Sequence, residues 1–233
     1  LVRIYGDYMI VSAPSEVNTS SQGSVYIYKR DISTGWPTTH TAKLVVTGGD
    51  GSEYFGGALA MNETYIVIGA KYNTDAGSAY IFEQNGSGVW TQTVKLGTTD
   101  PNILNLGLAV AIHGNYIVVG GGATVHSSAS RNGAVYIYEL INGTWGTEVS
   151  NETYRGETKK ILPSISSHYD NFGTSVAIHG NYIVVGARSE DSDGTDQSNN
   201  NLTGSGAAYL FERDNSTGWP STETKFLKSP TPL

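Results

Sequence analysis

The eleven residues VAIHGNYIVVG occur twice without change, at residues 110–120 and at residues 176–186. Weaker copies lie at residues 59–69, which read LAMNETYIVIG, and at residues 2–12, which read VRIYGDYMIVS. Self-similarity that recurs along a chain is the sequence signature of a repeat architecture. The 233 residues are therefore interpreted as four related units.

Three further elements follow each copy in the same order. A Gly-x-x-Tyr segment begins at Gly23, Gly77, Gly133 and Gly206, and a lone tryptophan follows at Trp36, Trp90, Trp145 and Trp219. A lysine-containing apolar segment closes each unit and reads TAKLVV, QTVKLG, TKKILP or TKFLKS. Segments rich in Val, Ile and Tyr, separated by Gly, Asn, Asp and Ser, predict four short strands per unit.

These units predict an all-β fold, a β-propeller built of four-stranded antiparallel blades. One domain is expected over residues 1–233, with repeats at 1–48, 49–99, 100–165 and 166–233. Gly-Asp, Asn-Glu and Gly-Asn pairs should form tight hairpin turns between the first two strands. The second strand is apolar throughout and should be buried on both faces near the axis, whereas the third alternates and should be half-buried.

The in-phase tryptophans are expected to pack between blades. The alternative is an exposed aromatic platform for sugar.

Unit length varies mainly in the connection between the second and third strands. This connection is short at residues 71–76, longer at 14–22 and 122–132, and longest at 188–205. Insertions of this kind map to loops on one face of a repeat protein, often the binding face.

Phe55-Gly56 with Gly69-Ala70, and Phe172-Gly173 with Gly186-Ala187, resemble the FG-GAP repeat. That family includes the head propeller of integrin α subunits and many microbial and protist surface proteins. The third unit departs from the pattern with Leu106-Gly107. The resemblance implies a propeller, usually of seven blades, with roles in adhesion and ligand binding and seldom in catalysis.

Seven blades need more residues than this chain has. It is therefore either a fragment of a larger propeller, a chain completed by another copy, or four blades that close alone.

Composition excludes several functions. The net charge is −7 and no basic stripe is present, which argues against nucleic acid and against an anionic membrane surface. No apolar run reaches the roughly 20 residues of a membrane helix, so no direct membrane insertion is expected, and no signal peptide is recognised. The absence of cysteine removes disulfides and thiolate chemistry.

N-x-S/T sequons indicate N-linked glycans and an extracellular or cell-surface location. They lie at Asn18, Asn62, Asn85, Asn142, Asn151, Asn201 and Asn215. The alternative is that a surface rich in Ser, Thr and Asn produces sequons by accident.

One acidic cluster, Asp191, Asp193 and Asp196, is a candidate Ca²⁺ site, because alternating carboxylates with a glycine can wrap that ion. The EF-hand spacing is absent, so a solvated polar loop is the alternative. The hairpin turns lack the integrin-type calcium loop, and His113 and His179 are interpreted as equivalent turn residues.

No catalytic motif is present, so no catalytic residue is assigned and the chain is not expected to be an enzyme. The predicted function is a non-catalytic extracellular module for protein–protein binding, adhesion or assembly of a surface structure, either with a protein partner or by self-assembly through the variable loops. Two alternatives are a glycan-binding propeller and a propeller hydrolase or lyase. Convergent acidic side chains would support the last of these.

Overall fold

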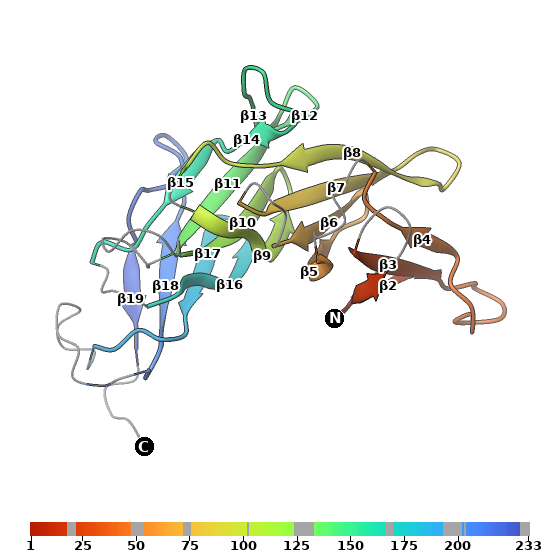
Figure 1. The fold of residues 1–233 in the computed structure, drawn as a ribbon, viewed down its shortest axis with the longest axis horizontal. Helices are drawn as coiled ribbons and strands as arrows, with labels where there is room; N and C mark the ends of the chain where they lie inside the picture. The colour runs from red at the N-terminus through yellow and green to blue at the C-terminus, as the bar shows by residue number, and fades with distance from the viewer. Residues whose placement is uncertain are drawn as a thin grey trace.

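The computed structural model describes residues 1–17, 22–47, 54–71, 76–101, 103–123, 133–165, 170–192, 202 and 204–228. The regular secondary structure in these residues consists of strands, which form four sheets that follow one another in chain order along a curved row (Figure 1). None of the described residues forms a helix that is long and apolar enough to cross a membrane. The predicted all-β fold with antiparallel sheets is confirmed.

Each sheet is built around the four main strands of one unit. Sheet 1 contains β1 (Val2–Tyr5), β2 (Tyr8–Val17), β3 (Gln22–Lys29) and β4 (Ala42–Leu44). Sheet 2 contains β5 (Phe55–Met61), β6 (Tyr65–Ala70), β7 (Ser78–Gln84) and β8 (Trp90–Leu96). Sheet 3 contains β9 (Ile103–His113), β10 (Tyr116–Ala123), β11 (Ala134–Ile141), β12 (Thr144–Trp145) and β15 (Lys159–Ile161). Sheet 4 contains β16 (Phe172–His179), β17 (Tyr182–Ala187), β18 (Ala207–Glu212) and β19 (Lys225–Leu227).

Two short strands of the third unit leave their own sheet, which the repeat pattern did not predict. β13 (Thr147–Glu148) pairs with β14 (Arg155–Gly156), and Arg155 pairs in parallel with Leu96 at the end of β8. The outer edge of sheet 2 is therefore extended by residues of the third unit. Unit length consequently also varies between the third and fourth strands.

The hairpin turns between first and second strands form as predicted. Gly6, Gly114 and Gly180 have φ of 54°, 53° and 56°, a backbone region that glycine enters without steric cost. In sheet 2 the turn is closed by a side chain instead, because Asn62 Oδ1 accepts the N–H groups of Thr64 and Tyr65 at 3.0 and 2.8 Å.

The Phe-Gly positions form a bulge at the start of β5 and β16, and Leu106-Gly107 lies at a bulge within β9. The residues before these pairs, Tyr54, Asn105 and Asn171, have φ of 52°, 58° and 57°, and the glycines Gly56, Gly107 and Gly173 have φ of 94°, 89° and 88°. Leu106-Gly107 adopts the same shape, so the departure of the third unit from Phe-Gly leaves the local structure intact.

Glycines also let the backbones of neighbouring sheets approach closely. A Cβ at Gly120 would lie 2.0 Å from the carbonyl oxygen of Gly173, and one at Gly133 would lie 2.0 Å from that of Phe172. The motif residues therefore specify contacts between sheets as well as turns.

Three hydrophobic clusters fill the three interfaces between consecutive sheets. In each cluster the fully buried aromatic side chains come from the later sheet and the earlier sheet supplies aliphatic ones. We call the face of the later sheet in each interface its aromatic side, and the face of the earlier sheet its aliphatic side. The buried aromatic residues are Phe55, Tyr80, Phe82 and Trp90, then Tyr136, Tyr138 and Trp145, then Phe172, Tyr209, Phe211 and Trp219.

A tyrosine–tryptophan contact closes each interface. The pairs Tyr8–Trp90, Tyr65–Trp145 and Tyr116–Trp219 have ring centroids 5.8, 5.3 and 5.5 Å apart, each with an interplanar angle of 86°. Edge-to-face pairs of this kind are favourable beyond the area that they bury. Packing of tryptophans between sheets is confirmed for these three. It is wrong for Trp36, which is 39% exposed because no sheet of this chain lies against it.

The third strands are more buried than predicted. The first five residues of β7 and of β11 are buried, because both faces of these strands are covered by neighbouring sheets. The predicted alternation occurs in β18, where Tyr209 and Phe211 are buried and Leu210 is half-buried. Sheet 4 has one face that no other described sheet covers.

Candidate functional site

The connections between second and third strands lie at the same end of the sheets as the connections between units. This follows from antiparallel order, since the two hairpin turns within each unit lie at the opposite end. We call this end the loop face. Much of the longest connection, residues 188–205, lies outside the described residues.

A tyrosine, a lysine and an acidic residue meet on the loop face of sheet 1. Tyr26 and Lys43 are cross-strand neighbours in β3 and β4. Tyr26 Oη donates to Glu16 Oε2 at 2.7 Å, and Lys43 Nζ donates to Glu16 Oε1 at 2.7 Å. The Lys43 ammonium, followed by the Tyr26 hydroxyl, lowers the pKa of Glu16 to about 2. Glu16 is thus held as a carboxylate.

The same arrangement recurs in sheet 3. Tyr136 and Lys160 are cross-strand neighbours, Tyr136 Oη donates to Asp100 Oδ2 at 2.7 Å, and Lys160 Nζ contacts the same oxygen. The Asp100 side chain is 9% exposed and that of Lys160 is 37% exposed, so the cluster is reachable from solvent. Burial, followed by the negative charges of Asp100 and Glu157, raises the pKa of Tyr136 far above its usual value. The phenol therefore stays a hydrogen-bond donor.

Glu157 supplies a second carboxyl group to this cluster. It lies between β14 and β15, and its Oε1 accepts the Thr98 hydroxyl at 3.1 Å. Its Oε2 is buried and has no hydrogen-bond partner among the described residues. The glutamate at the matching position of sheet 4, Glu223, instead accepts both the hydroxyl and the N–H of Ser164, at 2.6 and 2.7 Å. Glu157 therefore keeps one carboxyl oxygen that is not engaged by any described residue.

The acidic cluster of sheet 4 is closed to solvent. Lys228 Nζ contacts Glu190 Oε2, and these two side chains are 2% and 3% exposed. Glu190 Oε1 also accepts the N–H of Ser192 at 3.1 Å. Because neither charge reaches the surface, this pair ties the chain end to the 188–192 connection rather than forming an open site.

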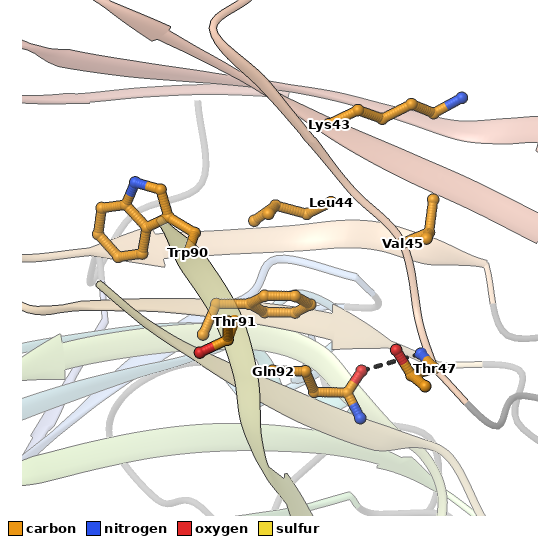
Figure 2. Close-up of a pocket in the computed structure, with 8 residues that line it drawn as sticks. Lys43, Leu44, Val45, Thr47, Trp90, Thr91 and Gln92 are labelled. Atoms are coloured by element: carbon orange, nitrogen blue, oxygen red, sulfur yellow. Dashed lines mark hydrogen bonds between the residues drawn. The ribbon is translucent and has the colours of Figure 1, made fainter. Parts of the chain in front are cut away.

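A groove lies between the outer strands of sheets 1 and 2 (Figure 2). Its volume is about 500 Å³, with Leu44, Phe82 and Trp90 as apolar walls. Gln92 Oε1 accepts the N–H of Thr47 at 3.0 Å and bridges the two outer strands. No carboxylate is among the described residues that line it, so the groove can hold a small ligand but lacks an acid–base pair.

The predicted calcium residues are only partly described. Asp193 and Asp196 lie outside the described residues, whereas Asp191 accepts the N–H of Gly204 on its carboxylate and that of Leu202 on its carbonyl. Within the described part of the chain, no three His, Asp or Glu side chains are grouped as metal ligands. The Ca²⁺ site stays a prediction.

The sequon asparagines that can be placed lie in turns. Asn85, Asn142, Asn151 and Asn215 are exposed, and Asn62 is half-buried in its hairpin turn. Asn18 and Asn201 lie outside the described residues. Glycosylation and the extracellular location stay predictions.

Sequence reasoning assigned no role to Asp100 or Glu157. Alignment of the four units by their third and fourth strands would have shown the repeated Tyr–Lys pair. It would not have shown that Glu157 and Asp100 share the Thr98 hydroxyl, because Glu157 reaches Thr98 only where β14 pairs in parallel with β8.

Comparison with known proteins supports the repeat. The FG-GAP repeat model matches residues 38–82 and 156–211. No characterised protein matches the chain by sequence.

Among solved structures, the chain resembles a Bacteroides uniformis protein provisionally described as a 6-phosphogluconolactonase, with 13% identity and a TM-score of 0.55. The match covers 96% of this chain but 55% of that protein, so the chain spans about half of its length. A GH43 endo-arabinanase from Bacillus licheniformis matches with 12% identity and a TM-score of 0.45, over 94% of this chain and 74% of that one. A mutant α-L-arabinanase from Cellvibrio cellulosa matches with 10% identity and a TM-score of 0.46, over the same shares of 94% and 74%.

These comparisons correct the predicted function. The expectation of a non-catalytic module, and of a chain that is not an enzyme, was drawn from the FG-GAP resemblance and the absence of motifs. The Bacteroides protein, whose fold this chain resembles, is described as an enzyme, so neither ground excludes catalysis. At such low identity the likeness shows the fold alone, and chemistry has to be argued from the residues of this chain.

Proposed function

Residues 38–82 and 156–211 match the FG-GAP repeat, and from that premise we propose that the four sheets are blades of a propeller hydrolase that acts on a carbohydrate. The observation that supports this most is a pair of carboxyl groups joined through one hydroxyl. The Thr98 hydroxyl donates to Glu157 at 3.1 Å and accepts the N–H of Asp100 at 3.1 Å, and the Asp100 carboxylate accepts the hydroxyl of Tyr136. The fold likeness to the Bacteroides protein also supports the proposal, since that protein is described as a 6-phosphogluconolactonase.

Two carboxyl groups suffice for hydrolysis of a glycosidic bond. Lys160 and Tyr136 both contact Asp100, so Asp100 is held as a carboxylate that can accept a proton from water. Glu157 in its protonated form donates to the leaving oxygen. The water oxygen bonds to the sugar carbon as the carbon–oxygen bond breaks, and the proton lost by water replaces the one donated by Glu157 when the two groups exchange protons with solvent.

The test is hydrolysis of a panel that includes arabinan, xylan, other plant and microbial polysaccharides, and a sugar lactone, with release of reducing ends or acid as the readout. Glu157→Gln and Asp100→Asn should each lower the rate about 100-fold or more, the usual range for loss of a general acid or base. Glu16→Gln is the matched control, since it removes the acid of the equivalent Tyr–Lys cluster in sheet 1 and should leave the rate unchanged.

Hydrolysis of no member of the panel, or an activity that both variants keep, would contradict the proposal.

A further inference from the structure

The two ends of the row of sheets carry the two halves of one interface. Each internal interface joins the aliphatic side of one sheet to the aromatic side of the next. Sheets 1 and 4 lie at the two ends of the row (Figure 1). Among the described residues, no other sheet covers the outer side of sheet 4, which is of the aliphatic kind, or that of sheet 1, which is of the aromatic kind. The two uncovered faces are therefore complementary in kind.

The uncovered side of sheet 4 repeats a surface that is buried elsewhere in the chain. Residues 176–186 are identical to residues 110–120, which receive sheet 4 on sheet 3. Val118 is 0% exposed, whereas Val184 at the same position is 37% exposed, and Tyr182 is 48% exposed. Residues 176–186 thus have the sequence of a surface that binds a sheet in sheet 3, and no described sheet contacts this side of them in sheet 4.

Sheet 1 carries a copy of the segment with which sheet 4 packs against sheet 3. Residues 30–37 read RDISTGWP and residues 213–220 read RDNSTGWP, which differ at one position. The two tryptophans differ in their surroundings, since Trp219 is 8% exposed and Trp36 is 39% exposed.

The two RD-x-STGWP segments also have the same shape. Asp31 Oδ1 accepts the N–H groups of Ser33 and Thr34 at 2.8 and 2.9 Å. Asp214 Oδ1 accepts those of Ser216 and Thr217, both at 2.8 Å. The Ser33 and Ser216 hydroxyls, followed by these N–H groups, hold the pKa of both carboxyl groups well below the usual value, so each turn is fixed at neutral pH. Trp36 consequently follows a turn of the same shape as the turn before Trp219.

We infer that sheet 1 of a second copy of this chain docks on sheet 4. In the contact between sheets 3 and 4, Trp219 lies edge-on to Tyr116, and the Arg213 guanidinium lies 5.3 Å from the centre of the same ring. In the contact between copies, Trp36 takes the place of Trp219 on Tyr182, and Arg30 takes the place of Arg213. The second copy is the occupant because this chain itself carries both halves in matching sequence.

The contact is heterologous, so it generates either a ring or a filament. Two copies joined by two such contacts give eight blades, within the four to eight that propellers use. The surface involved is the sheet face, not the variable loops through which self-assembly was predicted from the sequence. The loop face, with Asp100 and Glu157, stays accessible in such a ring.

Sedimentation analysis of the purified chain tests the proposal. The expected mass is twice the 24.8 kDa of one chain, and Val184→Asp and Trp36→Asp should each reduce it to that of a monomer. Both positions are exposed within one chain, so unchanged circular dichroism should show that the variants fold. Ile32→Asn is the matched control, because Ile32 is 98% exposed and the change makes the turn read as it does in sheet 4. It should leave the dimer intact.

A mixture of the two monomeric variants distinguishes this contact from a symmetric one. A pair made of one Val184→Asp chain and one Trp36→Asp chain keeps one unaltered contact, so the mixture should regain 1:1 complexes. A mixture that stays monomeric, or a wild-type chain that is monomeric at every concentration measured, would overturn the proposal. So would variants that keep the wild-type mass.

Discussion

Strands β10 and β17 have the same sequence around them but different neighbours. Both lie within VAIHGNYIVVG, and both pair with a first and a third strand in the same register. Sheet 4 covers the Val118 face of β10, whereas no described sheet covers the matching Val184 face of β17. Val118 is accordingly buried while Val184 is partly exposed. Local sequence sets the strand and its turns, whereas burial depends on whether the next unit is present.

The largest expected effect comes from a charge placed at the two equivalent valines. Val118→Asp should destabilise the chain by about 4 kcal/mol or more, because it buries an unpaired carboxylate in a packed interface. Val184→Asp should change the free energy of unfolding by less than about 1 kcal/mol, since its side chain reaches solvent. Urea denaturation, at protein concentrations low enough to exclude self-association, measures both. Equal losses at the two positions would show that β17 is covered in the folded chain.

This comparison also shows how far the sequence predicts the fold. The repeat predicts the strands and their antiparallel order, and the glycines at 6, 114 and 180 predict the hairpin turns. The exposure of Trp36 was predicted wrongly because an in-phase tryptophan looks the same whether or not a sheet lies against it. The prediction of half-buried third strands was wrong for β7 and β11, because a sheet lies against each of their two faces, and it held for β18.

The candidate site was harder to predict than the fold. Asp100 follows a predicted strand, and the Tyr136–Lys160 pair belongs to the repeat. Glu157 reaches the cluster through a parallel pairing between β14 and β8, which no local pattern encodes. Contacts made by residues inserted between repeat elements depend on tertiary packing, so they cannot be derived from periodicity.

The next effect concerns the glycines that end the two identical stretches. Gly120→Ala would place a Cβ 2.0 Å from the backbone oxygen of Gly173, whereas Gly186→Ala meets only the hydroxyl of Ser175, at 2.2 Å. A serine side chain can rotate away and a packed backbone cannot. Gly120→Ala should therefore cost about 3 kcal/mol, the upper part of the range for overpacking, and Gly186→Ala less than about 1 kcal/mol. Thermal unfolding of the two variants checks this, and a Gly120→Ala protein as stable as the wild type would show that sheets 3 and 4 do not pack so closely.

The smallest effect comes from a phenol on the covered aromatic side of sheet 3. Burial, followed by the charge of Glu157, raises the pKa of Tyr138 well above its ordinary value, and its Oη donates to the carbonyl oxygen of Gly97 at 2.7 Å. The phenol ionises near pH 10 in the unfolded chain but not in the folded chain. The stabilisation is therefore complete below pH 10 and is lost as pH rises above it, at about 1.4 kcal/mol per pH unit for each such tyrosine.

Tyr138→Phe should cost about 1 kcal/mol at pH 7 through the lost hydrogen bond, and should reduce the slope of stability against pH above 10 by one proton. Urea midpoints measured at pH 7 and from pH 10 upward separate the two effects. If the variant kept the wild-type slope above pH 10, Tyr138 would have to ionise in the folded chain. That would require the interface between sheets 2 and 3 to be open to water.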